Sequence, residues 1–166
     1  MHDAECIEID DFVAGHKTLV GFKPKWGEDY FGYHQCRWGV ADVHGAEPAE
    51  LCLSVSRDGV YHTISCLHRQ RIIYRLDTAP EDECKPNWHT AAAMGLSPIV
   101  CGPHVHGWQE NRDYVRVNGF GRMPVRRGID GSVLTLLDAI HWVASDLNIQ
   151  IDAGQRDIEM PDRVLV

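Results

Sequence analysis

Two histidines, His104 and His106, stand two positions apart in the short segment 103–108. On a β-strand, side chains two residues apart project from the same face, about 7 Å from each other. Two imidazoles at that spacing suit two ligands of one metal ion, or an acid and a base on either side of a phosphodiester. This segment is therefore the first candidate for a functional site.

Cysteines and a further histidine near this pair have the side-chain types that bind zinc. Their spacing follows no familiar zinc-finger pattern, and each has a structural alternative: a histidine can hydrogen-bond within a polar strand, and a cysteine can pack as a small apolar group. We therefore predict no bound cofactor, with zinc as the alternative. The ligands in that case would be Cys84, His89, Cys101, His104 and His106.

A second group of basic side chains lies on two neighbouring predicted strands. His62 and His68 share one face of the first strand, and Arg71, Arg75 and Asp77 share a face of the next. Imidazole and guanidinium groups can transfer protons and stabilise phosphate charge without a metal. We predict that His62 and His68 contact the substrate, provided that this sheet brings them beside the pair at 104–106.

The net charge of −8 is unevenly distributed, since residues 1–12 and residues 128–166 each carry −5 and the middle of the chain carries +2. A globally acidic protein binds nucleic acid poorly through its long-range field, but a local arginine patch can hold a phosphate at short range. We predict substrate contacts from Arg112 and Arg116; the alternative is a solvated face paired with the acidic ends. The full patch comprises Arg112, Arg116, Arg122, Arg126 and Arg127.

Several functional classes lack their sequence signatures. No P-loop, no glycine-rich dinucleotide motif, no HExxH and no GxSxG occurs, which argues against nucleoside triphosphatases, dinucleotide enzymes, zincins and serine hydrolases. No run of apolar residues is long enough to span a membrane, and the acidic N-terminus does not resemble a signal peptide. We expect a cytoplasmic protein without membrane contact, whose six cysteines are reduced thiols.

Hydrophobic patterning predicts a single α+β domain over residues 1–166. Apolar alternation at 30–42, 49–57, 60–69 and 70–79 indicates consecutive strands, with Asp58-Gly59 as a type I′ hairpin turn. Further strands are expected near 104–109 and 113–119. The result is an antiparallel meander of about four to six strands.

One C-terminal amphipathic helix is expected to cover this sheet. Apolar residues recur at helical spacing from Val133 to Leu147, and Ser132 is the predicted N-cap. The stretch 78–103 holds prolines and cysteines without alternation, so we expect an irregular loop with a short helix near 89–95. The tail at 153–166 is expected to be loose or to add an edge strand.

Two short motifs and the final helix resemble small bacterial toxins of toxin–antitoxin modules, in particular the TumE-like group. The resemblance covers about 75–110 and the closing helix, and rests on Tyr74-Arg75-Leu76-Asp77-Thr78-Ala79-Pro80 and Pro103-His104-Val105-His106. It implies a metal-independent ribonuclease neutralised by a cognate antitoxin. It also implies catalytic roles for Arg75, Asp77, His104 and His106.

Three hypotheses remain open from the sequence. The first is a nuclease-like toxin, bacterial or from a mobile element, that acts on phosphodiesters with histidine and arginine side chains. The second is a non-enzymatic acidic inhibitor, encoded by a phage or plasmid, that covers a basic nucleic-acid-binding surface of a host protein. The third is a zinc-stabilised structural protein. The ten histidines favour the first, and the acidic ends favour the second.

Overall fold

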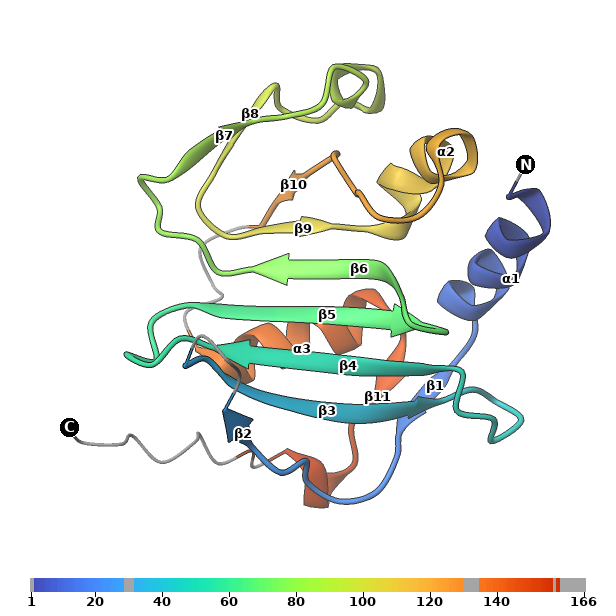
Figure 1. Cartoon of the computed structure of the whole chain (residues 1–166), viewed down its shortest axis with the longest axis vertical. Helices are drawn as coiled ribbons and strands as arrows, with labels where there is room; N and C mark the ends of the chain where they lie inside the picture. Colours follow the sequence, from blue (N-terminus) through green and yellow to red (C-terminus); the bar gives the residue numbers. More distant parts are fainter. Residues whose placement is uncertain (1, 29–31, 130–134, 157, 159–166) are drawn as a thin grey trace.

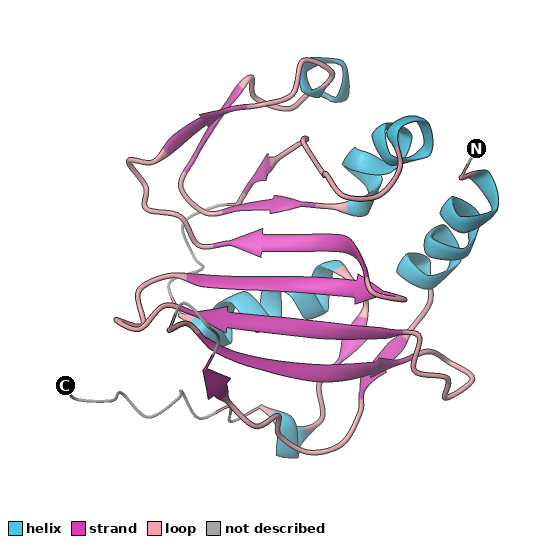
Figure 2. Cartoon of the chain, in the orientation of Figure 1, coloured by secondary structure: helices cyan, strands magenta, loops and turns pink. Residues whose placement is uncertain are grey.

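The computed structural model of the chain describes residues 2–28, 32–129, 135–156 and 158, and Figures 1 and 2 show the arrangement of its elements. The longer strands are β3 (His34–Ala41), β4 (Ala49–Val55), β5 (His62–His68) and β6 (Arg71–Asp77). The α-helices are α1 (Asp3–Ala14), α2 (Trp108–Asn118) and α3 (Leu136–Asp146). The shorter elements are β1 (Lys17–Leu19), β2 (Gly27–Glu28), β7 (Cys84–Pro86), β8 (Ile99–Cys101), β9 (His104–His106), β10 (Arg127–Gly128), β11 (Ile149–Gln150), η1 (Ala91–Met94) and η2 (Ala153–Gln155).

The predicted α+β class is confirmed, and the meander β3–β4–β5–β6 forms its centre. The sheet is larger than the predicted four to six strands: eight strands follow the order β10-β9-β6-β5-β4-β3-β1-β11, and β2 pairs with β3 beside this path. The strand expected near 104–109 is present as β9; the strands that were not predicted in this sheet, β1, β2, β10 and β11, are two or three residues long. Segments this short show no measurable alternation, so patterning could not find them.

The helices also differ from the expectation of a single C-terminal helix. α3 is confirmed and lies across one face of the sheet (Figure 1). Its N-cap is Thr135, which forms a capping box with Asp138; the predicted cap Ser132 lies outside the described residues. Among the described helices none combines the length and the apolar character needed to cross a lipid bilayer.

The predicted strand at 113–119 is wrong, because these residues belong to α2. Trp108, Asn111 and Val115 are the buried residues of this helix, and their spacing of three and four is that of one helical face. Val115 and Val117, two positions apart, are compatible with a strand, and the polar Asn111 does not stand out as a core position in the sequence. α1 packs beside α2 at one end of the sheet (Figure 1).

The β4–β5 hairpin is confirmed, but its turn is not type I′. Six residues separate the two strands, and Gly59 has a positive φ whereas Asp58 does not. The Asp58 carboxylate accepts hydrogen bonds from Ser56 Oγ and Val60 N, which stabilises a wider loop. The two-residue turn instead joins β5 to β6, where Arg69 and Gln70 both adopt positive φ.

A β-bulge interrupts β6 and corrects its predicted faces. Cys66 pairs with Tyr74 and Leu67 pairs with Ile72, so Ile73 is an extra residue on β6. Tyr74 and Leu76 are buried, whereas Ile72 is 45% exposed. Arg71 pairs with His68, so it does not share the face of Arg75 and Asp77 as predicted. A bulge reverses the facing of every residue before it. The isoleucine therefore points away from the core.

The stretch 78–103 contains regular structure in addition to the expected short helix, which is η1. β7 and β8 pair antiparallel with Cys84 opposite Cys101, and these two cysteines form a disulfide. The prediction that all six cysteines are reduced is therefore wrong for this pair, because strand pairing brings together two residues that lie 17 positions apart. The other four are free thiols.

Candidate functional site

The candidate site lies where β9 joins the edge of the meander. β9 pairs antiparallel with β6, with His106 opposite Arg75 and His104 opposite Asp77. Residues directly opposite on paired strands project from the same face of a sheet. All four residues implied by the toxin resemblance therefore share one face. It is the face opposite α3, and none of the described helices lies in front of β3–β5 there in Figure 1.

Three side chains converge on this face. Oδ2 of Asp77 lies 3.8 Å from Nε2 of His104 and 3.8 Å from Nε2 of His106. One ligand atom from each of the three residues lies within 4.8 Å of the others. Both imidazoles are buried, and the Asp77 side chain is 15% exposed. We call these three residues the Asp-His-His cluster.

Backbone carbonyls orient both imidazoles. Nδ1 of His104 lies 2.9 Å from the Gly102 carbonyl oxygen, and Nδ1 of His106 lies 2.5 Å from that of Met123. A carbonyl oxygen only accepts hydrogen bonds, so Nδ1 must carry the proton in each ring. In a neutral imidazole this leaves a lone pair on Nε2, directed at the cluster.

Hydrogen bonds to the other carboxylate oxygen, Oδ1, hold the Asp77 side chain in place. Oδ1 accepts hydrogen bonds from Nε and Nη2 of Arg75 and from Oγ1 of Thr63. In this orientation Oδ2 faces the two histidines. Thr63 is opposite Asp77 on β5, so three neighbouring strands contribute to one carboxylate environment.

Burial is the largest influence on the pKa of His106. It lowers the pKa of this imidazole to about 4, although the Met123 carbonyl and the Asp77 carboxylate both act in the opposite direction. His106 is therefore neutral near pH 7. A neutral imidazole has the lone pair that a metal ligand or a general base requires.

Asn111 is a supporting residue that no sequence pattern singles out. It is fully buried on α2, and its side chain donates to the Val125 carbonyl while accepting from the Val125 N–H. These bonds tether the segment that follows α2. Because Met123 lies in that segment, Asn111 helps to place the carbonyl that orients His106.

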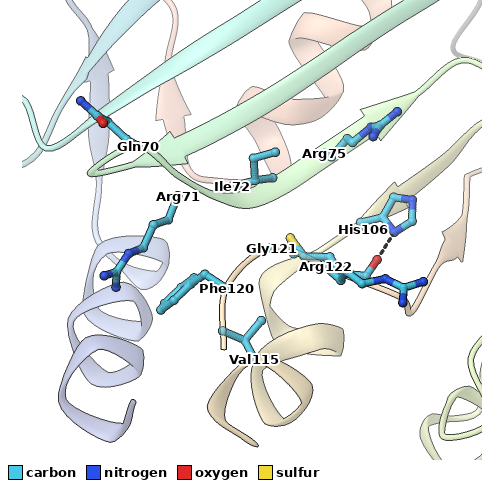
Figure 3. Close-up of a pocket in the computed structure, with 10 residues that line it drawn as sticks. Gln70, Arg71, Ile72, Arg75, His106, Val115, Phe120, Gly121 and Arg122 are labelled. Atoms are coloured by element: carbon cyan, nitrogen blue, oxygen red, sulfur yellow. Dashed lines mark hydrogen bonds between the residues drawn. The ribbon is translucent and has the colours of Figure 1, made fainter. Parts of the chain in front are cut away.

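A cleft of about 400 Å³ lies beside the cluster. Figure 3 shows that it lies between β6 and the segment after α2, and that His106 stands at one end. His106 belongs to both the cluster and the cleft wall. Arg75 of β6 also connects the cluster to the cleft, since it donates a hydrogen bond to Asp77 and lines the cleft. The other lining residues are Gln70, Arg71, Ile72, Val115, Phe120, Gly121, Arg122 and Met123.

The predicted substrate-binding residues lie elsewhere. His62 and His68 are buried on the opposite face of β5, which faces the core, so the structure does not bring them to the cluster. Burial lowers the pKa of both. Period-two alternation places them with Ile64 and Cys66 rather than with Thr63.

Arg112 and Arg116 also lie away from the cluster and pair with acidic residues. Nη2 of Arg112 lies 2.7 Å from Asp10 of α1, and Arg116 lies 4.0 Å from Asp3 and 3.5 Å from Asp113. The alternative reading of the arginine patch, as a face paired with the acidic ends, fits these two residues. Neither one lines the cleft.

The predicted five-residue zinc site does not form. Cys84 and Cys101 are bonded to each other, so neither has a free thiolate for a metal. The His89 ring contacts Trp88, with centroids 4.7 Å apart. Among the described residues, the group able to hold a metal ion consists of Asp77, His104 and His106. Only the two histidines were in the predicted set.

Comparisons of the chain with protein-family models, with curated proteins and with solved structures found no match.

Proposed function

We propose that this chain is a nuclease-like hydrolase that cleaves phosphodiesters at the Asp-His-His cluster with the help of a bound divalent metal ion, for which zinc is the first choice. The observation that supports this most directly is the convergence of three lone-pair atoms. Nε2 of His104, Nε2 of His106 and Oδ2 of Asp77 all face one another. A carboxylate oxygen and the Nε2 atom of a neutral imidazole whose Nδ1 is bound to a carbonyl are all hydrogen-bond acceptors. A cation between them would satisfy all three.

The distances support the same interpretation. Zinc binds histidine nitrogen and carboxylate oxygen at about 2.0–2.2 Å, which separates tetrahedral ligands by about 3.3 Å. The two separations of 3.8 Å need only a small contraction. Three protein ligands also leave a position for water or substrate, as catalytic zinc sites do. The carbonyls on Nδ1 and the Arg75 contact to Asp77 supply the orienting partners typical of metal sites.

The reaction would be hydrolysis. A metal ion here would polarise a phosphoryl oxygen and lower the pKa of a bound water. Water supplies the oxygen of the new P–O bond, the bond to the leaving oxygen breaks, and that oxygen takes up a proton. The products are a phosphomonoester and an alcohol. Arg75, at the junction of cluster and cleft, would stabilise charge on the phosphoryl group.

A metal-free mechanism has less support. It requires one imidazole to donate a proton as a general acid and another to accept one. Both rings here carry their proton on Nδ1, where a carbonyl binds it. The Nε2 atoms meet at one carboxylate rather than standing on either side of an open gap. RNA as the substrate and a cognate antitoxin as partner rest on the toxin resemblance alone.

The acidic-inhibitor hypothesis also has less support. Three acids of α1 contact arginines of this same chain: Glu5 binds Arg71, Glu8 binds Arg69 and Asp10 binds Arg112. Carboxylates already paired internally are poorly placed to cover a basic partner.

A cleavage assay tests the proposal. A short end-labelled RNA is incubated with metal-stripped protein to which Zn²⁺, Mn²⁺ or EDTA is added. We expect metal-dependent cleavage that falls about 100-fold or more in His104→Gln, His106→Gln and Asp77→Asn. His141→Gln, which changes an exposed histidine of α3, is the matched control and keeps full activity. Equal activity in EDTA would contradict the proposed role of a metal ion. Absence of cleavage with each of these metals would contradict the proposed hydrolase function.

A further inference from the structure

The cleft beside the cluster combines apolar and polar side chains, with Gln70 and Arg71 at the end away from His106 (Figure 3). Ile72, Val115, Phe120 and the Met123 side chain supply apolar surface. Arg75, Arg122 and His106 supply polar groups at the end near the cluster. A ligand that fits both kinds of side chain has an apolar body joined to an anionic group.

The cleft is basic although the protein is acidic. Three arginines line it, and none of the described lining residues is acidic, while the whole chain carries −8. Arg71 is paired with Glu5 and Arg75 with Asp77. Arg122 is exposed and has no ion-pair partner among the described residues. Its charge is therefore available to an anionic ligand.

The end of the cleft away from His106 also presents planar groups. The Arg71 guanidinium lies 4.4 Å from the centroid of the Phe120 ring, and the Phe120 ring is stacked parallel to Trp108. The ion pair with Glu5 holds Arg71 in place. Aromatic rings and guanidinium planes are the surfaces on which unpaired bases stack in single-stranded nucleic-acid sites.

We infer that this cleft is a subsite for one unpaired nucleotide of a single-stranded nucleic acid, with its base among Ile72, Val115 and Phe120 and its phosphate toward Arg122 and Arg75. The inference rests on the proposed function, because it assigns the substrate of the same site. The volume of about 400 Å³ is in the range of small-molecule sites. It is large enough for a single base that has left its stack.

Binding measured without cleavage tests this inference. Fluorescence anisotropy in EDTA compares a labelled single-stranded RNA, the same sequence in DNA, and the corresponding duplex. We expect either single strand to bind at least 10-fold more tightly than its duplex. A preference for RNA over DNA would identify the natural strand. Single-stranded binding no tighter than duplex binding would overturn the inference.

Two variants locate the bound nucleotide. Phe120→Leu removes the ring and should weaken single-strand binding about 5- to 100-fold, the range for one base–aromatic contact. Arg122→Gln should weaken it and lower the slope of log affinity against log salt by about 0.7, the value for one phosphate contact on a single strand. The matched controls are Phe22→Leu, at a ring that is 76% exposed, and Arg37→Gln on the exposed surface of β3.

Arg122 is exposed, so its variant should fold even if Phe120→Leu does not, and circular dichroism checks both. Unchanged affinity and salt slope in a folded Arg122→Gln would overturn the inference. The two proposals also fail separately. If cleavage depends on metal but Phe120→Leu and Arg122→Gln bind single strands as the wild type does, only the proposed nucleotide subsite is contradicted. If the protein binds single strands selectively but cleaves none of them, only the proposed hydrolase function is contradicted.

Discussion

Two pairs of histidines occupy the same sheet on opposite faces, and their surroundings differ. His62 and His68 lie on the core face of β5 together with apolar side chains. His104 and His106 lie on the other face of β9, and both are directed at Asp77. All four imidazoles are buried. Burial alone therefore does not distinguish a histidine of the core from one of the site.

The hydrogen bonds make the distinction. Each site histidine has Nδ1 bound to a backbone carbonyl and Nε2 directed at a shared carboxylate. On the core face, Nδ1 of His62 has no hydrogen-bond partner among the described residues. The His68 ring packs against Phe12, and its Nε2 lies 3.7 Å from a carboxylate oxygen of Glu8, which His62 does not share. Two imidazoles with fixed tautomers whose lone pairs converge on one carboxylate indicate ligand binding, whereas single imidazoles that share no partner indicate packing.

The largest expected effect comes from the core face. Leu76 is fully buried on β6, between Arg75 and Asp77. Leu76→Ala should lower the free energy of unfolding by about 2–5 kcal/mol, because it leaves a cavity under the sheet. Zinc affinity of the folded protein, measured by calorimetry, should remain unchanged. If affinity falls together with stability, the two faces are not independent.

The neighbouring residue should behave in the opposite way. Arg75→Gln removes the guanidinium that holds Oδ1 of Asp77. Zinc affinity should fall about 10- to 100-fold, as for other residues that orient a metal ligand, while the free energy of unfolding changes by less than about 1 kcal/mol. Arg37→Gln, which removes another exposed arginine of this face, should change neither quantity. Unchanged zinc affinity in Arg75→Gln would contradict the orienting role.

The smallest expected effect is the pH dependence of stability. Burial lowers the pKa of His62 below its ordinary value of 6.5, so the unfolded chain takes up this proton first as the pH falls. The stability contribution is complete above about pH 6.5 and is lost on acidification below it.

Denaturant unfolding at about pH 7.5 and about pH 5, with metal removed, measures this loss. The loss should be smaller in His62→Met than in the wild type. It should not vanish, because burial lowers the pKa of His68 and His106 as well. An equal loss in both proteins would show that His62 does not titrate in this range.

Much of the centre of the fold could be predicted. The alternation of Leu51, Leu53 and Val55 and the helical repeat of α3 reflect local geometry, in which each residue's facing follows from its neighbours. The shared face of His104 and His106 follows in the same way. The resemblance added Arg75 and Asp77, and the structure brings both beside the histidines.

Other features could not be read from local patterns. The bulge at Ile73 turns Ile72 into the cleft, and only the pairing of β6 with β5 reveals it. The buried Asn111 concealed the periodicity of α2, because an amide is buried only where its hydrogen-bond partners exist. The disulfide and the position of Phe120 depend in the same way on residues distant in the chain.

The sequence by itself determined which residues face together along each strand and helix, since backbone geometry repeats over a few residues. Only the tertiary structure decided that β9 pairs with β6, that Asp77 meets both imidazoles, and that the Gly102 and Met123 carbonyls hold their protons. Strand order and register minimise the free energy of the whole chain rather than of any segment. The pair at 104–106 was visible from the start, and its carboxylate partner and carbonyls turned it into a candidate metal site.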